Sequence, residues 1–366
     1  MGAPRPGWAD THGRSVAPCD QAAAVQTVPH ATVAAACREQ GLSHLASLVP
    51  PGPLDPAGLE RMLADGVGDL AWLGEDRHLR LDPCGLLPSA RAILCVAWHY
   101  PAAQPAPGLR RAAYAAGKDY HVLLRPKLGR VGAALNARCG QTWRHRACVD
   151  SAPLAERTLS RLAGLGWLGR NALLISPESG SYRLLGFLLT EAPLEVQHGG
   201  HGEDRCGSCT RCEDLCPTRA LVGRRCLTER CISYLTIEHR GVIARELAER
   251  FAGWWFGCDL CQEACPWNRF APPGEDVRLA GRDDEAALLA LTAERFDTHF
   301  AGRAVRRLSW ERFRRNLLVA LWSVGRHAEV GAILAEGLPL VRAQAAELGI
   351  AVPQLAETTA RPQDPA

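Results

Sequence analysis

The sequence predicts an α/β core followed by a cysteine-rich module and a helical tail. The run ARAILCVAWHYP, from Ala90 to the closing Pro101, is typical of a buried strand. Helical and strand patterns mix throughout residues 30–195, and the chain becomes arginine-rich and helical after Pro266. With 366 residues, of which 47% are hydrophobic and 22% charged, the chain is long enough for more than one domain.

Around the buried strand, the patterns of the core predict further helices and strands. The segment 172–190 is expected to form a β-hairpin, with SPESGS as its turn. Pro126 is expected to kink or restart the helix in which it lies. The other expected elements, in chain order, are a helix followed by a strand or turn within 32–49, a helix over 59–63, a helix from about Tyr120 toward Leu135, a strand near 146–149 and a helix over 154–162.

These patterns divide the chain into four parts. Residues 1–28 show no stable period and are expected to be a disordered extension. Residues 29–197 form the core, 198–272 the cysteine-rich module and 273–366 the tail. In the tail, RRNLLVALWSVG and EVGAILAEGLPLVRAQAAEL predict one amphipathic helix pair, a remnant of a HEAT-like repeat array.

Composition predicts a cytoplasmic protein, and a monomer is expected. The chain has no run of about 18 uncharged apolar residues, so no membrane span is expected. The first residues lack the apolar stretch of a signal peptide, and fifteen cysteines suit a reducing compartment. The net charge of +3 is too small to indicate nucleic-acid binding by itself.

The cysteine-rich module predicts two 4Fe-4S clusters. CGSCTRCEDLCPT has the bacterial ferredoxin spacing, in which three cysteines bind one cluster and the fourth reaches its neighbour, and CDLCQEACPWN is an incomplete copy. The missing thiolate is assigned to Cys231, which opens an apolar segment, rather than to Cys226 beside Arg224 and Arg225. The two ligand sets are then Cys206, Cys209, Cys212 and Cys265, and Cys216, Cys231, Cys258 and Cys261.

Two other uses of these cysteines fit less well. A zinc ribbon needs four thiolates on two separated knuckles, and a run that ends in Cys-Pro matches it poorly. A disulfide framework is typical of small secreted chains. Two adjacent low-potential clusters therefore favour an electron-transfer path.

Several further segments together resemble the epoxyqueuosine reductase family. They are GDLAWL (68–73), GKDYH (117–121), VDSAPLAERTLSRLAGLGWLGRNALLISPESGSYRLLG (149–186), RCISYLTIEHRG (230–241), the two cysteine runs and RRNLLVALWSVG (314–325). In this order they span most of residues 60–325. One ferredoxin run alone would be weak support, but the series is specific.

The resemblance implies a fold and a reaction. The fold is a cobalamin-binding α/β core like that of reductive dehalogenases, followed by the two-cluster domain and helical repeats. The reaction is the two-electron reduction of the epoxide of epoxyqueuosine at the wobble position of tRNA, with loss of water. Cobalamin performs it, fed by the clusters and by an external donor of flavodoxin or ferredoxin type.

Asp150 is the expected proton donor. By the resemblance, it is the family's proposed acid, and a carboxyl shielded by the corrin face can have a raised pKa. The alternative from the pattern alone is that Asp150, before SAP, caps a helix that starts near Pro153.

The same resemblance implies the corrin-lining residues. They are Arg80, Ala112, Asp150, Leu174, Ser176 and Leu185 from the core, and Ile232, Ser233 and Asp259 from the cluster module. On pattern alone, Arg80 is a solvated surface arginine, and the two leucines are core residues.

Two short motifs are interpreted as coincidences. GLGWLG (164–169) spells GxGxxG but follows a helix rather than a strand, so we expect its small residues to admit the corrin plane instead of a dinucleotide. DTHFAG (297–302) matches a cobalt-ligating histidine motif of another cobalamin fold, yet it lies beyond the cluster module. We expect His299 to be an exposed or satisfied histidine.

Contact with tRNA is assigned to five arginines, Arg240, Arg269, Arg312, Arg314 and Arg315. On the pattern alone, they could equally be a solvated helix face. Two other functions remain open, namely an electron-transfer protein that serves a partner enzyme, and a reductive dehalogenase. The first needs no corrinoid, and the second is typically exported with a twin-arginine signal, which the N-terminus does not show.

Overall fold

The fold was analysed in a computed structural model that describes residues 8–9, 15–16, 27–102, 108–196 and 202–352. Most of the predicted N-terminal extension lies outside these ranges. Its described part consists of β1 (Trp8–Ala9) and β2 (Ser15–Val16), which pair antiparallel with each other.

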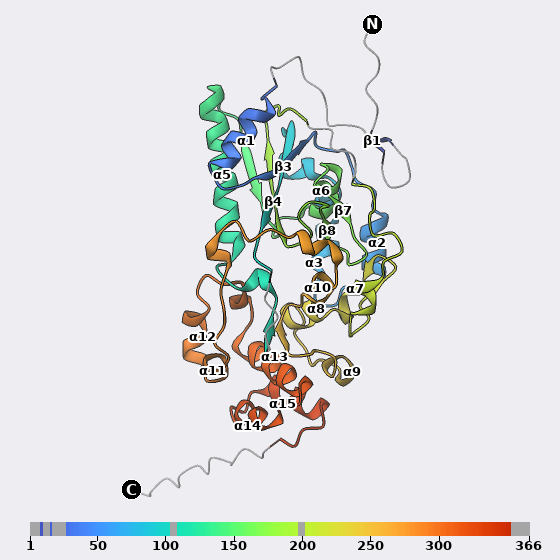
Figure 1. The fold of residues 1–366 in the computed structure, drawn as a ribbon, viewed down its shortest axis with the longest axis vertical. Coiled ribbons are helices and arrows are strands. Elements are labelled where there is room, and N and C mark those ends of the chain that lie inside the picture. The colour runs from blue at the N-terminus through green and yellow to red at the C-terminus, as the bar shows by residue number, and fades with distance from the viewer. Residues whose placement is uncertain (1–7, 10–14, 17–26, 103–107, 197–201, 353–366) are drawn as a thin grey trace, which may run out of the picture.

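The core is built on a four-stranded antiparallel sheet (Figure 1). Its order is β3 (His44–Leu48), β4 (Ala92–His99), β9 (Arg183–Thr190) and β6 (His145–Cys148). Every residue of β4 is buried, as its unbroken apolar run predicts. One face packs on α1 (His30–Arg38) and α5 (Tyr120–Cys139), and the other on α6 (Glu156–Leu162). The predicted α/β core is confirmed.

The predicted hairpin over 172–190 is wrong. β9 pairs with β4 and β6, whereas β8 (Leu174–Ile175) pairs with β7 (Trp167–Leu168). Ser176 and Gly180 form only an isolated bridge that closes a small loop. The eight-residue β9 is apolar on both faces, so it occupies the middle of the sheet rather than the arm of an exposed hairpin.

The glycines of GLGWLG have a packing role. Gly166 has φ +147°, and a Cβ built on it would lie 2.1 Å from the carbonyl oxygen of Ile175. The small residue therefore permits close approach of β7 and β8. The interpretation that it makes room for the corrin plane is not needed to explain it.

Short helices complete the core. The helix expected at 59–63 is α2 (Ala57–Ala64). The long helix α5 continues through Pro126, so this proline does not restart it. The remaining elements are α3 (Trp72–Glu75), α4 (Arg77–Leu81), η1 (Pro83–Leu86), β5 (Arg110–Arg111) and η2 (Ala113–Ala115).

The cysteine-rich module is a compact set of short elements. They are α7 (Arg211–Asp214), β10 (Leu221–Val222), β11 (Arg225–Cys226), η3 (Thr228–Arg230), α8 (Ile232–Ile237), α9 (Arg245–Ala248), β12 (Trp254–Phe256), α10 (Leu260–Glu263) and η4 (Pro266–Phe270). β12 pairs in parallel with β5, which fixes the module to the core.

The tail has more helices than the predicted pair. RRNLLVALWSVG lies in α13 (Trp310–Ser323), but the second segment is divided into α14 (His327–Leu334) and α15 (Pro339–Glu347). Gly337, at φ +69°, and Pro339 interrupt it. The earlier tail elements are η5 (Val277–Leu279), α11 (Glu285–Leu289), α12 (Ala293–His299) and η6 (Ala304–Arg307). Within the described ranges, no helix is both long and apolar enough to cross a membrane.

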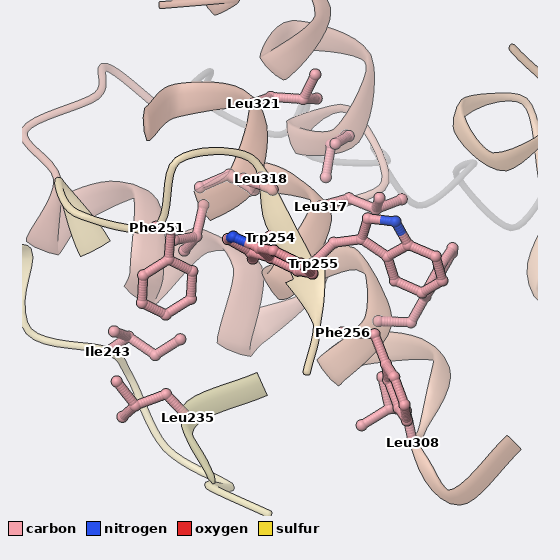
Figure 2. Close-up of a cluster of buried hydrophobic side chains, with 14 of the residues drawn as sticks. Leu235, Ile243, Phe251, Trp254, Trp255, Phe256, Leu308, Leu317, Leu318 and Leu321 are labelled. Carbon is pink, nitrogen blue, oxygen red and sulfur yellow. The ribbon is translucent and has the colours of Figure 1, made fainter. Parts of the chain in front are cut away.

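One hydrophobic core joins the module to the tail (Figure 2). Trp254, Trp255 and Phe256 of β12 are at most 1% exposed and pack in a cluster with Leu317 and Leu321 of α13. The boundary that we predicted near residue 272 therefore does not separate two hydrophobic cores.

Candidate functional site

The first predicted ligand set comes together at one pocket. Cys206, Cys209, Cys212 and Cys265 all line it, with Trp267 at its edge. Cys265, from the second cysteine run, therefore lies close enough to serve as the fourth ligand of the first set. The indole Nε1 of Trp167 donates a hydrogen bond to Sγ of Cys206 at 3.4 Å, and hydrogen bonds to ligand sulfurs tune cluster potentials.

The second set also converges. The thiol of Cys258 interacts electrostatically with those of Cys231 and Cys216, and Cys261 interacts with Cys258 and Cys231. Burial raises the pKa of the Cys258 and Cys261 thiols well above the ordinary value. Such thiols become thiolates when a metal compensates the charge.

Cys231 acts electrostatically on both Cys258 and Cys261, which supports its prediction as the eighth ligand. It lies at the start of α8, where the thiol of Cys226 and the backbone N–H groups of Ser233 and Tyr234 lower its pKa. Cys226 is nevertheless its direct neighbour, because the two thiols share a hydrogen bond. The polar surroundings of Cys226 in the sequence did not reveal this proximity.

Asp150 adopts an unusual backbone conformation just after β6. Its φ is +50°, which is uncommon for a residue with a Cβ. Its N–H donates to Oε1 of Glu156 at 2.7 Å, and its Oδ2 lies 3.2 Å from Nε2 of His121. The helix that follows begins at Glu156, with Ala155 as an N-cap that makes no side-chain bond. The capping interpretation of Asp150 is therefore wrong, since its side chain bonds to His121 instead.

His121 connects Asp150 to a second carboxylate. Its Nδ1 lies 2.6 Å from Oδ1 of Asp119, and its ring stacks on Tyr120 at 4.1 Å. Burial lowers the pKa of His121, but hydrogen bonds to Asp119 and Asp150 outweigh it and raise the pKa to about 9. The hydrogen bond to His121 lowers the pKa of Asp150. With these contacts the proton of the pair resides on the imidazole, and the raised pKa of Asp150 beneath a corrin face stays a prediction.

The pKa of Glu156 is shifted in the opposite direction from that of Asp150. Burial, followed by the charge of Asp150, raises the pKa of Glu156 to about 8. At neutral pH Asp150 is therefore ionised and Glu156 protonated. Neighbouring carboxyls with separated pKa values are typical of acid–base sites.

Part of the predicted corrin-lining set gathers around Tyr114. The Tyr114 hydroxyl interacts electrostatically with Asp150 and with Asp259. Asp259 is 1% exposed, accepts a 2.6 Å hydrogen bond from the N–H of Ala113, and has a pKa that burial raises to about 6. Ala112 is buried beside it and donates its N–H to Phe256.

Arg80 reaches the same site from α4. Its guanidinium interacts electrostatically with Asp76, Glu156 and Asp150, and it lies 4.8 Å from the ring of Trp72. Its Nε is buried and has no hydrogen-bond partner among the described residues. Arg80 is therefore partly buried, and its role at a corrin stays a prediction.

The other predicted corrin-lining residues lie in three elements. Leu174 and Ser176 are buried at β8, Leu185 packs against the α6 side of the sheet, and Ile232 and Ser233 begin α8. The Ser176 hydroxyl donates to Glu178. Their role at a corrin stays a prediction.

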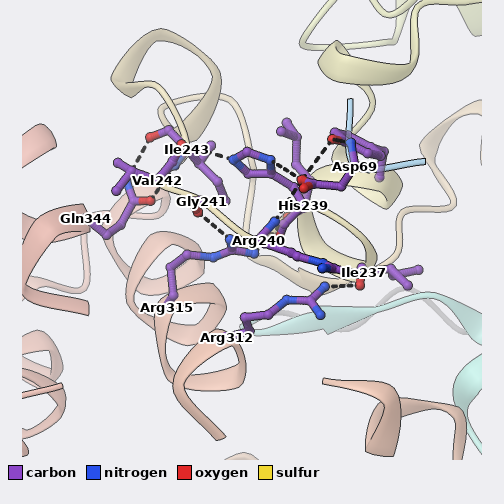
Figure 3. Close-up of polar contacts among 12 residues, drawn as sticks. Asp69, Ile237, His239, Arg240, Gly241, Val242, Ile243, Arg312, Arg315 and Gln344 are labelled. Carbon is purple, nitrogen blue, oxygen red and sulfur yellow. Dashed lines mark hydrogen bonds and ion pairs between the residues drawn. The ribbon is translucent and has the colours of Figure 1, made fainter. Parts of the chain in front are cut away.

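Two of the five predicted tRNA arginines lie together (Figure 3). Arg240 is exposed, and its backbone N–H donates to Oδ2 of Asp69 at 3.1 Å. Arg312 is half-buried and donates to the carbonyl of Ile237. Burial lowers the pKa of Arg312, and the charge of Arg240 lowers it further, so the two guanidinium groups act on each other electrostatically.

For Arg314 and Arg315 the tRNA prediction is wrong, because both are buried, at 2% and 0% exposure. Arg315 donates to the carbonyls of Leu235, His239 and Gly241. It thus supports the loop that presents Arg240. Arg314 pairs with Glu336 of the tail.

Arg269 and His299 lie elsewhere. Arg269 lines the pocket of the first cysteine set, 4.5 Å from the ring of Phe270. His299 is exposed at the end of α12 and contacts Phe300, in agreement with the interpretation of its motif as a coincidence.

Our sequence analysis missed three residues around Asp150. They are His121, Glu156 and Arg307, whose charge acts on both Asp150 and Arg312. GKDYH and VDSAPLAE were recognised as segments of the resemblance, but only Asp150 was given a role. The contact between His121 and Asp150 spans 29 residues and has no periodic signal.

These features define an iron-sulfur oxidoreductase with an acid–base site in an attached α/β domain. Residues 205–268 match the family described as a 4Fe-4S double cluster binding domain, and residues 80–151 match the one described as epoxyqueuosine reductase QueG, DUF1730. The epoxyqueuosine reductase of Vibrio cholerae is 37% identical over 69% of this chain and 72% of its own length. That of Escherichia coli is 38% identical over 69% and 70%.

The solved structures agree. A crystal structure of epoxyqueuosine reductase with an epoxyqueuosine-modified tRNA-Tyr stem loop is similar to this chain, with a TM-score of 0.75 and 29% identity over 87% of this chain and 88% of that one. The chain belongs to the epoxyqueuosine reductase family.

Proposed function

We propose that this protein reduces epoxyqueuosine in tRNA to queuosine. The reaction consumes two electrons and two protons, opens the epoxide, and releases its oxygen as water. Family membership supports the assignment, and the observation that carries it is the acid–base site formed by Asp150, His121 and Glu156. The charges of Asp150 and of Asp259, which lies between Cys258 and Cys261 in the sequence, both act on Tyr114. An electron path and a proton source are the two things that this reaction requires.

The residues present fit the expected cofactors. Eight thiols in two groups of four suit two 4Fe-4S clusters. For cobalamin, Arg80 offers a buried Nε without a partner among the described residues, which an amide oxygen of the corrin could satisfy. Asp150, Ala112 and Asp259 would hold the group from the other elements. When bound, cobalamin supplies the two-electron reduction.

Asp150 delivers the first proton in this proposal. Its half-exposed carboxylate can face a substrate, whereas His121 is more enclosed, with side-chain exposures of 50% and 24%. The imidazolium of His121 protonates Asp150 when the developing alkoxide requires acid, and the ring becomes neutral. Before this transfer, the carboxylate of Asp119 stabilises the positive charge on the ring. The left-handed backbone of Asp150 is held by its hydrogen bond to Glu156, while its carboxylate contacts His121.

The proton on His121 predicts an alkaline limit. Because the pKa of His121 is raised to about 9, the proton is present below that pH and is lost as the pH rises through it. The single-turnover rate of the wild type should therefore fall above pH about 9. In His121→Asn that limb should disappear, and the rate should be lower throughout, measured by conversion of modified tRNA between pH 6 and 10. The same alkaline limb in the variant would exclude His121 as its origin.

Arg240 and Arg312 are proposed to bind the tRNA backbone. They form a cationic surface beside Arg307, which acts electrostatically on Asp150. Phosphates bound there would bring the modified base toward the acid. The related structure with a modified tRNA stem loop shows that a member of this family binds such a substrate.

Neutralising this surface should weaken tRNA binding. Arg240→Gln and Arg312→Gln should each raise the Kd for tRNA. The slope of log Kd against log salt concentration should also decrease by roughly 0.7–0.9 for each phosphate that the variant no longer neutralises. Arg38→Gln, on the exposed side of α1, is the matched control and should leave both unchanged. Filter binding with a modified anticodon stem loop measures this. An unchanged salt slope in both surface variants would show that the tRNA binds elsewhere.

The decisive test of the function is a single-turnover assay. Protein reconstituted anaerobically with iron, sulfide and cobalamin should convert epoxyqueuosine in tRNA when given a low-potential reductant. Omission of cobalamin should abolish the conversion. A protein that holds both clusters but neither binds corrinoid nor reacts would instead be an electron carrier for a partner enzyme.

A reducing cytoplasm and a monomeric state are part of this proposal. The chain has fifteen cysteines, and a reducing compartment keeps the eight proposed cluster ligands available for iron. The electron donor is proposed to be a flavodoxin or ferredoxin. Size-exclusion chromatography with light scattering tests the oligomeric state.

A further inference from the structure

Three potential metal ligands converge outside the site described above. His44 is the first residue of β3, His99 is the last of β4, and Glu275 follows the cysteine-rich module. The ligand atoms of the three side chains all lie within 4.8 Å of one another. Oε1 of Glu275 lies 2.6 Å from Nδ1 of His99 and 3.4 Å from Nδ1 of His44.

The backbone fixes this arrangement. In the antiparallel ladder of β3 and β4, His44 pairs with Ala97, and side chains two residues apart share a face, so His99 lies on the same face as His44. The two imidazole rings meet edge to face at 4.3 Å. The N–H of Glu275 donates to the carbonyl of His99 at 3.1 Å, which holds the carboxylate against both rings.

We propose that His44, His99 and Glu275 bind a divalent cation of the zinc class. Two imidazole nitrogens and one carboxylate oxygen are a donor set that zinc prefers. The side chain of His99 is fully buried, that of Glu275 is 18% exposed, and that of His44 is 41% exposed. An ion can therefore enter beside His44, and water can complete its coordination.

The carboxylate of Glu275 supplies the negative charge that a cation requires. Two cations oppose it among the described residues. Arg183 acts electrostatically on His99, and Lys127 acts on Glu275.

The competing explanation is a carboxylate that accepts hydrogen bonds from two imidazoles. A tetrahedral ion with bonds of about 2.0–2.1 Å needs its ligands about 3.3 Å apart. The contact between His44 and Glu275 has this spacing, and that between His99 and Glu275 must open by less than about 1 Å. The bound ion would tie the segment that follows the module to the end of the central sheet.

Zinc binding by the fully reconstituted protein tests the proposal. Anaerobic protein with both clusters and cobalamin is incubated with zinc, desalted, and analysed for zinc, iron and cobalt. We expect about one zinc per chain, and X-ray absorption with nitrogen and oxygen ligands near 2.0–2.1 Å and no sulfur near 2.3 Å. Zinc should also raise the melting temperature of this protein.

Matched variants complete the test. His44→Gln and Glu275→Gln should each lose the zinc and the thermal shift, with iron content unchanged, whereas His78→Gln, at an exposed histidine of α4, should retain both. Absence of zinc from the wild type would overturn the proposal and leave the hydrogen-bonded carboxylate. Sulfur ligands in the absorption spectrum would overturn it as well, because they would place the zinc on cluster cysteines.

Discussion

Asp150→Asn is expected to abolish the conversion of epoxyqueuosine while both clusters and cobalamin remain bound. Asparagine has nearly the same shape, and it can keep the contact with Nε2 of His121, but its amide cannot pass a proton to an alkoxide. Loss of a general acid typically reduces a rate by about 10²–10⁴-fold. The measurement is the single-turnover rate on modified tRNA, with iron, cobalt and tRNA affinity determined on the same preparation.

Two comparisons make this result interpretable. Asp150→Glu keeps the acid and should recover part of the rate, because only the reach of the carboxyl changes. Glu156→Gln keeps an acceptor for the N–H of Asp150 and tests whether the protonated neighbour is needed. A wild-type rate in Asp150→Asn would assign the proton to another group, of which His121 is the nearest.

The second large effect is expected at Cys231. Cys231→Ser should lose the second cluster, so that iron falls from about eight to about four atoms per chain, and turnover should stop. Cys226→Ser should retain both clusters, since Cys231 lies at the start of α8 with two backbone N–H groups directed to its sulfur. Iron and sulfide analysis with electron paramagnetic resonance of the reduced protein distinguishes the two variants.

The thiols of Cys226 and Cys231 share a hydrogen bond, so both variants are needed to identify the ligand. Should Cys226→Ser lose the cluster and Cys231→Ser keep it, the ligand assignment would be reversed. Should each single variant keep the cluster and the double variant lose it, either thiol would serve.

Sequence reasoning succeeded where a local pattern determines the structure. The spacing of the cysteine runs predicted which thiols meet in the first pocket, and the unbroken apolar run at β4 predicted a strand buried on both faces. These patterns need no knowledge of distant contacts. The order of core elements was predictable for the same reason.

The errors arose where tertiary contacts decide. Leu174 and Leu185 belong to different sheets, because β9 finds better burial between β4 and β6 than in a hairpin. Arg314 and Arg315 have the composition of a basic helix face but are covered by the module and the tail. The contact of His121 with Asp150 was not predicted, because the sequence does not show that the two side chains lie together.

Because β12 and α13 share one hydrophobic core, the binding of the second cluster and the stability of the helical tail are thermodynamically coupled. Cys258 follows β12 by two residues, so any ligand-induced ordering of the cysteine segment is transmitted to a strand packed on the tail. Binding energy of the cluster therefore stabilises helices that never touch iron. Conversely, a destabilising substitution in α13 or α15 should weaken the binding of the second cluster. The protein should then lose the absorbance of its iron-sulfur clusters more readily in air.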